Sequence, residues 1–240
     1  SYGIGHVISG RYWLRCEPGK VHWCISDTGW AKAAYAMLFG PMIQGATVFT
    51  VGANFEPAQT LQVLQEYPIQ GFCGAPTVYR MLVQQDLSRV SVPRLERCCS
   101  AGEPLNPEVI EEWEAFCGLR IREGYGQTET VILAASWDEI EVRPGSMGKP
   151  APGFDLQVVD PDGRVCEAGE EGEIAIRVKP ERPLGLFLEY RDAPERMEES
   201  FRGDWYYTGD RAVCDEDGYF WFQSRTDDVI ITSGYRIGPF

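Results

Sequence analysis

The sequence is organised around the stretch Gly124-Tyr125-Gly126-Gln127-Thr128-Glu129-Thr130, which lies between two short apolar runs. Two glycines within three residues indicate a tight turn or a backbone that approaches a ligand closely. Thr128 supplies a hydroxyl and Glu129 a carboxylate, and such oxygens can contact phosphate groups and a hard cation such as Mg²⁺. Surface turns of this composition are also common, so the stretch takes its meaning from the elements around it.

Residues 1–142 alternate between short β-rich runs and helical runs. Strands are predicted over 21–26, 46–51, 69–73 and 95–99. Helices are predicted over 30–39, 57–67, 76–87 and 107–117. Because strand and helix alternate, the sequence predicts a doubly wound parallel α/β sheet. Ligands of such sheets bind beyond the carboxyl ends of the strands, so the loops at Gly102 and Gly126 are expected to meet at one binding crevice.

Local signals predict where several helices end. Gly118 is the expected C-cap of the 107–117 helix. The pair Gly40-Pro41 predicts that the 30–39 helix stops there. The apolar face of the 76–87 helix is expected to comprise Val78, Met81 and Leu82.

From residue 143 onward the pattern changes to alternating strands. Strand patterns cover 154–159, 173–178, 205–207 and 219–222, with turn signals between them at 161–163 and 215–218. This pattern predicts a small antiparallel, β-barrel-like subdomain over 143–224, packed on the α/β part of residues 1–142.

Composition narrows the class of protein. The formal net charge of −14 disfavours nucleic-acid binding, which needs clustered Lys and Arg. No apolar run is long enough to span a bilayer. The eight cysteines form no C-x-x-C pair and only two histidines are present, so we expect reduced thiols rather than a zinc site or disulfides.

Three more regions share the chemistry of the central stretch. They are Ser100–Pro104, Tyr207–Asp210, and Arg225–Asp228 running into Ser233–Arg236. In this order, and together with Ile25–Trp30, they resemble the adenylate-forming superfamily, the AMP-dependent acyl-CoA synthetases. The chain is most similar to the medium-chain acyl-CoA synthetase branch, and the resemblance covers essentially all of it.

The resemblance implies roles for individual residues. Glu129 would ligate the Mg²⁺ of ATP, with Thr128 in contact with phosphate. Asp210 would accept hydrogen bonds from both ribose hydroxyls, a task that suits an acceptor-only group. Arg225 would bind ribose hydroxyls or phosphate. The remaining residues assigned to the nucleotide are Gly102, Glu103, Pro104, Glu123, Gly124, Tyr125 and Gln127, of which Tyr125 would stack on the adenine.

Gly126 carries an expectation about the acid. In short-chain acetyl-CoA synthetases a tryptophan at the corresponding place closes the acyl pocket, whereas Gly126 has no side chain. The resemblance therefore implies an acyl group longer than acetate or propionate, or an aromatic one, with Trp30, Ala31 and Ala101 as pocket walls. Lys32 lies near that wall and does not fit a purely apolar pocket unless it points away.

The reaction implied by the resemblance has two halves. A carboxylate attacks the α-phosphate of Mg·ATP to give acyl-AMP and pyrophosphate, and the CoA thiol then displaces AMP. Residues 225–240 would form a hinge at Asp227 and the start of a C-terminal domain, with Arg236 meeting phosphate or CoA. Neither a phosphate loop nor that C-terminal domain is found in the sequence, so the chain alone is expected to have little or no ligase activity.

The expected partners are a small carboxylic acid, ATP and CoA, with no nucleic acid and no membrane span, and a homodimer is left open. The cytoplasm is the expected compartment, with the mitochondrial matrix as the alternative if a transit peptide has been lost. Two other functions stay open: an amino-acid-activating adenylation domain, and a catalytically inactive nucleotide-binding fragment. The first would need an acidic residue for the substrate ammonium, and residues 69–77 contain none.

Overall fold

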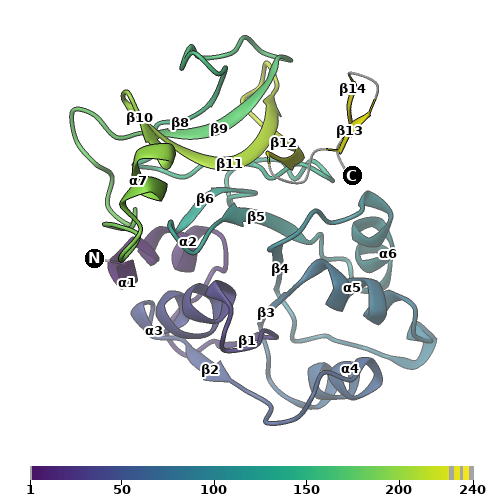
Figure 1. Cartoon of the computed structure of the whole chain (residues 1–240). Helices are drawn as coiled ribbons and strands as arrows, with labels where there is room; N and C mark the ends of the chain where they lie inside the picture. The colour runs from purple at the N-terminus through teal and green to yellow at the C-terminus, as the bar shows by residue number, and fades with distance from the viewer. Residues whose placement is uncertain (1, 227–229, 233–234, 238–240) are drawn as a thin grey trace.

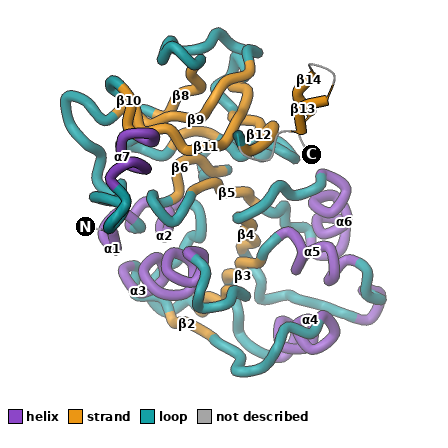
Figure 2. The backbone as a smooth tube through the Cα atoms, viewed as in Figure 1, coloured by secondary structure: helices purple, strands orange, loops and turns teal. Residues whose placement is uncertain are grey.

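The computed structural model describes residues 2–226, 230–232 and 235–237. Helices and strands alternate through the first part of the chain, whereas the later part is mostly strand and loop (Figures 1 and 2). The helical segments are α1 (Tyr2–Gly5), α2 (Val7–Tyr12), the π-helix η1 (Ala33–Phe39), α3 (Gly40–Ile43), α4 (Pro57–Glu66), α5 (Pro76–Val83), the 3₁₀ turn η2 (Leu87–Arg89), α6 (Pro107–Cys117) and α7 (Pro194–Ser200). The strands are β1 (Val21–Cys24), β2 (Thr47–Phe49), β3 (Gly71–Gly74), β4 (Arg97–Ala101), β5 (Arg122–Gly126), β6 (Ile132–Ala135), β7 (Lys149–Pro150), β8 (Leu156–Val159), β9 (Glu171–Arg177), β10 (Phe201–Arg202), β11 (Trp205–Cys214), β12 (Phe220–Arg225), β13 (Ile230–Thr232) and β14 (Tyr235–Ile237).

The first sheet has the strand order β2-β1-β3-β4-β5-β6-β7 in the described residues. Strands β2, β1, β3, β4 and β5 run parallel, which confirms the fold class expected from the alternation. Strands β6 and β7 continue the sheet in antiparallel pairing. This change of direction follows from the short connection between β5 and β6, because a parallel neighbour needs a crossover of a dozen or more residues.

Alternate residues of the central strands form rows on opposite faces of this sheet. The strand register places Trp23 beside Phe72 and Phe72 beside Cys98, and this row packs against α4, α5 and α6. The row on the other face consists of Cys24, Cys73 and Cys99 and packs against residues of α2 and η1. All eight cysteines are free thiols, as the sequence predicts.

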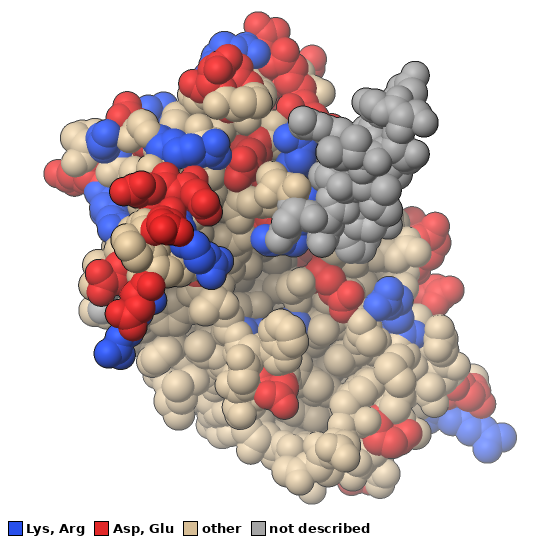
Figure 3. All heavy atoms as spheres, viewed as in Figure 1, with Lys and Arg blue, Asp and Glu red and all other residues tan. Residues whose placement is uncertain are grey.

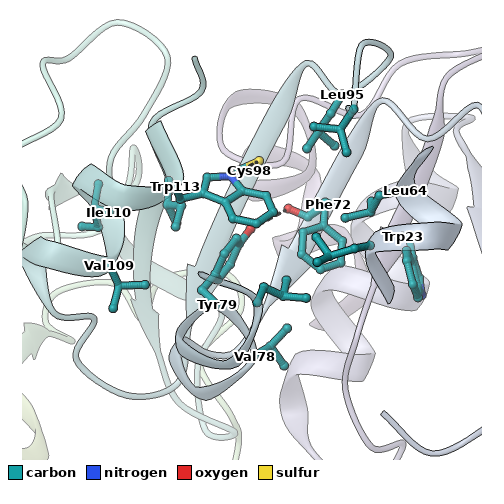
Figure 4. Close-up of a cluster of buried hydrophobic side chains, with 14 of the residues drawn as sticks. Trp23, Leu64, Phe72, Val78, Tyr79, Leu95, Cys98, Val109, Ile110 and Trp113 are labelled. Atoms are coloured by element: carbon teal, nitrogen blue, oxygen red, sulfur yellow. Dashed lines mark hydrogen bonds between the residues drawn. The ribbon is translucent and has the colours of Figure 1, made fainter. Parts of the chain in front are cut away.

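The first face carries an aromatic core, by which we mean Trp23, Phe72, Tyr79 and Trp113, packed together with aliphatic residues such as Ile110 (Figure 4). The Trp113 ring is fully buried, and its Nε1 donates to the Cys98 sulfur at 3.2 Å. The Tyr79 hydroxyl donates to the Cys99 carbonyl at 3.1 Å. Since both polar ring atoms have partners, burial of these rings costs no unsatisfied donor.

The predicted stop at Gly40-Pro41 is wrong. The helix runs through η1 into α3 and ends at Ile43. In η1 the Gly40 N–H bonds to the Tyr35 carbonyl five residues back, and this wider turn lets the chain pass Pro41, which has no N–H to place. Gly40 is needed there for packing, because a Cβ on Gly40 would lie 2.3 Å from the Tyr35 carbonyl.

Two details of the predicted 76–87 helix are also wrong. Helix α5 ends at Val83, and a separate 3₁₀ turn follows at η2. Met81 is 39 % exposed, whereas Val78 and Leu82 are buried as expected. The helix is short, so only one narrow stripe of its surface meets the sheet.

The second sheet is antiparallel, with the order β10-β11-β9-β8 and with β12 paired to β11. The predicted strand 205–207 is the beginning of the longer β11, which shifts its register between Tyr207 and Arg211. Leu133 and Ala134 of β6 pack into the core of this second sheet. Strand β7 lies after residue 142 yet belongs to the first sheet, and the division of the chain into domains at 142/143 stays a prediction.

Charge is distributed unevenly over the surface. On the face shown in Figure 3, acidic and basic side chains gather over the part built by β8–β11 and α7, while the α/β part below is largely uncharged. No helix in the part of the chain that the structure describes has the length and apolar character needed to span a bilayer.

Candidate functional site

A cavity of about 880 Å³ opens at the carboxyl ends of the parallel strands. Its wall includes residues that follow or end β1, β3, β4 and β5, together with residues of η1 and α4. Cavities at this edge are the usual ligand sites of open α/β sheets, because the strand-to-helix loops converge there. The loops at Gly102 and Gly126 both contribute to the wall, as the alternation of elements predicts.

The central stretch begins as strand β5 and leaves the sheet after Gly126. Thr128 is exposed on the cavity wall, which leaves its hydroxyl available to a ligand. Glu129 is half-buried, and its carboxylate accepts a hydrogen bond from the Tyr190 hydroxyl at 2.9 Å. The Phe187 N–H donates to the Glu129 carbonyl at 2.7 Å, so the loop near residue 187 also fixes the backbone here.

Asp210 on β11 connects the two sheets. It is only 5 % exposed, and its Oδ2 accepts from the Tyr125 hydroxyl at 2.6 Å and from Gln127 Nε2 at 2.7 Å. Its Oδ1 accepts from Arg225 Nη1 at 3.0 Å. We call these four residues, Tyr125, Gln127, Asp210 and Arg225, the polar seam. The fold thereby brings together residues that lie up to 100 positions apart in the sequence, and their contact with a nucleotide stays a prediction.

The polar seam fixes both the protonation state and the position of Tyr125. Burial, and then the Asp210 carboxylate, raise the pKa of the Tyr125 hydroxyl well above its ordinary value. The hydroxyl therefore stays protonated and donates to Asp210. A Tyr125 ring tethered in this way has a fixed position, which suits a stacking surface, and its stacking on adenine stays a prediction.

The segment Gly102-Glu103-Pro104 follows β4 and is exposed. Gly102 has φ +107°, a conformation that favours glycine. The Glu103 carboxylate accepts from the Thr77 hydroxyl at 2.7 Å and lines the cavity. The backbone of this segment is thus presented toward the cavity while the Glu103 side chain is partly engaged by α5.

Glu123 and Gly124, which the resemblance places beside the adenine, have side-chain positions that face the protein interior. Glu123 is buried, and its two carboxyl oxygens accept from the Leu105 N–H at 3.3 Å and the Gly145 N–H at 3.1 Å. Burial raises the pKa of Glu123 to about 8. A Cβ on Gly124 would lie 2.7 Å from the Trp13 ring. Both side-chain positions therefore serve the packing of β5, and any contact with a nucleotide would come from their backbone.

All four residues expected around the acyl group line the cavity. Trp30 is 69 % exposed on the wall, beside Ala31, and Ala101 is buried behind it. The built Cβ of Gly126 points toward the backbone at the start of β6. A Cβ there would lie 2.3 Å from the Val131 carbonyl, so a larger residue would first have to displace β6.

The two remaining predicted residues lie at the end of the chain. Asp227 lies outside the described residues. Arg236 lies in β14, where its backbone pairs with that of Ile231.

The donor set can be tested against the Mg²⁺ that the resemblance implies. Among the described residues, no group of three or more His, Cys, Asp or Glu side chains could hold a metal by itself. Mg²⁺ in nucleotide sites is usually held by one or two carboxylates together with substrate phosphates. Glu129, half-buried beside the exposed Thr128, fits that pattern as a single protein carboxylate.

Sequence reasoning assigned no role to two residues at the site. Tyr190 contacts the Glu129 carboxylate from a loop distant in sequence, and no pattern around it signals this. Lys32 is buried and lines the cavity. Its signal was a single charge inside an otherwise apolar helical run.

A parallel sheet with a large cavity at its carboxyl edge, flanked by carboxylates, hydroxyls and exposed glycine backbone, defines a ligand-binding α/β protein with a nucleotide-type site. The sequence model of the AMP-binding enzyme family matches residues 4–188, and the chain belongs to this family.

Relatives and solved structures agree with this assignment. "Acyl-coenzyme A synthetase ACSM3, mitochondrial" of Pongo abelii is 54 % identical over 241 aligned residues, which cover 100 % of this chain and 41 % of that protein. The crystal structure of the anthranilate CoA ligase AuaEII in complex with anthranoyl-AMP matches with a TM-score of 0.87 and 29 % identity, over 99 % of this chain and 45 % of that one. ATP-bound MatB from Rhodopseudomonas palustris matches with a TM-score of 0.88 and 25 % identity, over 99 % of this chain and 46 % of that one. The chain thus spans about two fifths of the length of the curated relative.

Proposed function

We propose that the chain is the central part of an AMP-forming acyl-CoA synthetase. The whole protein would activate a carboxylic acid with Mg·ATP to acyl-AMP and then transfer the acyl group to CoA. The observation that carries this proposal is the position of Asp210, which is held by Tyr125, Gln127 and Arg225 beside a cavity lined by Gly102, Gly126 and Thr128. The names of the acyl-coenzyme A synthetase relative and of the anthranilate CoA ligase support the same reaction class, and the ATP-bound MatB structure supports the use of ATP.

In the adenylation half, the residues of this chain bind and orient. Asp210 would offer fixed carboxylate oxygens to the ribose hydroxyls. The exposed backbone at Gly102 and the ring of Tyr125 would lie on opposite sides of the adenine. Thr128 would donate to phosphate, and Glu129 would hold Mg²⁺, which neutralises phosphate charge when bound. Catalysis of this kind rests on positioning and electrostatic stabilisation, because the protein forms no covalent bond in the step.

The proposed acid is a medium-chain one. The cavity of about 880 Å³ is lined by Trp30, Ala31, Ala101 and Gly126 as well as by the residues proposed for the nucleotide, which supports an acyl group bound in the same cavity. Residues 225–240 are proposed as a hinge at Asp227 and the beginning of a further domain, with Arg236 near phosphate or CoA. For the compartment we propose the mitochondrial matrix, as the printed name of the relative supports.

The test uses the full-length protein that contains this chain. Pyrophosphate release would be followed with ATP, Mg²⁺ and unbranched acids from acetate to dodecanoate, with benzoate and a set of amino acids alongside. A maximum at medium chain length is the expected result. A maximum at acetate would contradict the acyl-pocket proposal alone, and release only with amino acids would replace the proposed reaction by amino-acid activation.

A further inference from the structure

Lys32 is a largely buried lysine with no carboxylate partner among the described residues, although its charge acts on the thiols of Cys24 and Cys73. Its side chain is only 8 % exposed, and the described part of the chain offers it no hydrogen bond or ion pair. The other lysines are all partnered: Lys20 pairs with Glu96, Lys179 with Asp204, and Lys149 lies over the Tyr219 ring. Lys32 therefore differs from every other lysine in the chain.

The ammonium of Lys32 points into the cavity described above. Lys32 is a wall residue, and its Nζ would lie 3.5 Å from a Cβ built on Gly102. It immediately precedes η1, the wider π-helical turn that also contributes Tyr35 to the wall. Such π-segments often mark functional sites.

The carboxylates in the same wall are engaged elsewhere. Asp27 accepts from the Gly29 N–H at 2.7 Å, Glu56 from the Gln59 N–H at 2.6 Å, and Glu103 from the Thr77 hydroxyl at 2.7 Å. None of them forms an ion pair with Lys32 in the described structure. The described residues thus provide a cation in the cavity wall and no carboxylate that pairs with it, so a bound ligand can supply the acceptor.

The Lys32 ammonium is not among the buried polar atoms that lack a partner in the described residues, because it remains accessible from the cavity. A ligand that fills the cavity removes this access, and it leaves the ammonium at a cost unless the ligand itself supplies an acceptor. An apolar side chain of similar length, such as methionine, would fill the same place without that cost. A ligand that accepts a hydrogen bond from the Lys32 ammonium would explain why a lysine stands at this position in the cavity wall.

Building on the proposed function, we propose that Lys32 is a specificity-determining residue that binds an oxygen acceptor on the acyl part of the acid. The acceptor is a hydroxyl or a second carboxylate carried beyond the reacting carboxylate. Two observations support this assignment: Lys32 directly follows Trp30 and Ala31 of the proposed acyl wall, and the three residues line the same cavity. The Lys32 Nζ is near Gly102, so it lies on the side of the acyl wall that faces the proposed nucleotide. Lys32 is not assigned to the reacting carboxylate, because an ammonium bound there would weaken the nucleophile.

The test compares matched acids on the full-length protein. Hexanoate, its ω-hydroxy derivative and hexanedioate, with the corresponding four- and eight-carbon sets, would be assayed for kcat/KM by pyrophosphate release in wild type and Lys32→Met. We expect Lys32→Met to lower the preference for the best polar acid over its unsubstituted counterpart by about 10- to 100-fold, as for a hydrogen bond to a charged group. The unsubstituted acid of the same length is the reference, and its kcat/KM should change less than that of the polar acid.

Two controls separate this proposal from others. Lys179→Met removes an exposed lysine and should leave the preference unchanged. Binding of the same acids, measured by calorimetry in the absence of turnover, tests Lys32 even if no acid supports pyrophosphate release, which would count against the proposed function alone. An unchanged preference in Lys32→Met, in both binding and turnover, overturns the proposal, and so does an equal loss for substituted and unsubstituted acids.

Discussion

The aromatic core and the polar seam hold this protein together in opposite ways. The aromatic core lies between the parallel sheet and α4–α6, and its rings satisfy their polar atoms locally, as Trp113 does with Cys98. The polar seam joins the two sheets through one buried carboxylate, Asp210, that accepts from three side chains. Packing in the first region is independent of ligands, whereas the second region keeps charge and hydrogen-bonding groups beside the cavity.

The difference shows how the molecule separates stability from binding. Apolar burial is non-directional, and a close-packed core leaves no room for a ligand. Mutations in the aromatic core should therefore change the stability of the protein and not its binding of ligands. Hydrogen bonds to a buried carboxylate are directional and can be shared with a ligand. Mutations in the seam should therefore affect stability less and binding more.

The largest effect on stability is expected in the aromatic core. Trp113→Ala should lower the free energy of unfolding by about 3–5 kcal/mol, because it leaves a cavity where a fully buried ring was. Urea unfolding measures this loss. The control Met81→Ala, on the exposed side of α5, should stay within about 0.5 kcal/mol of wild type. Similar losses in both variants would contradict the packing described for α5.

A smaller loss is expected in the polar seam. Asp210→Ala should cost about 2 kcal/mol, because the hydroxyl of Tyr125 and the amide of Gln127 lose their acceptor inside the protein. The same unfolding measurement applies, with the exposed Asp204→Ala as a matched control of little effect. If Asp210→Ala were as stable as its control, the hydrogen bonds of the polar seam would not contribute to the stability of the fold.

The buried carboxyl of Glu123 should make stability depend on pH. Its pKa is raised by burial from 4.5 to about 8, so between these values the folded protein keeps a proton that the unfolded chain has lost. Stability should fall as pH rises through this window, by up to about 1.4 kcal/mol per pH unit, and level off above it. Glu123→Gln should flatten this slope, while the exposed Glu108→Gln should keep it. A wild-type stability that rises across the same window would contradict the assignment.

The smallest effect is expected at the end of α6. Gly118 has φ +74° and nothing within 4 Å of a built Cβ, so Gly118→Ala changes only the backbone energy. The cost should be about 1 kcal/mol. Gly52 is equally open but lacks a positive φ, and Gly52→Ala should cost nothing measurable in thermal unfolding.

Much of the fold could be predicted because its signals are local. Proline at helix starts and glycine at helix ends are read from neighbours in sequence, and Gly118 confirmed this at α6. The continuation of η1 through Gly40-Pro41 could not be predicted, since it depends on a π-turn and on close packing of Gly40. The contact between Tyr190 and Glu129 joins residues 61 positions apart, and no pattern in the sequence around either residue predicts it.

The candidate site was predictable to a similar degree. Motifs identified Thr128, Asp210 and Gly126; Thr128 and Gly126 line the cavity, and Asp210 of the second sheet is joined to it through Gln127. Motifs could not reveal which side chains are occupied by the protein itself. Glu123 is an example, because its two acceptors serve Leu105 and Gly145, which lie in separate loops.

The central claim is that the polar seam and Glu129 contact different parts of a bound acyl adenylate and its ATP precursor. The most direct measurement is calorimetric binding of a non-reactive hexanoyl-adenylate analogue, which lacks pyrophosphate, to the full-length protein and to its Asp210→Ala and Glu129→Gln variants. The account predicts binding about 10- to 100-fold weaker for Asp210→Ala, because the ribose loses a charged acceptor, and nearly unchanged binding for Glu129→Gln, because the analogue needs no Mg²⁺. Undiminished binding to a folded Asp210→Ala protein, or an equal loss in both variants, would contradict it.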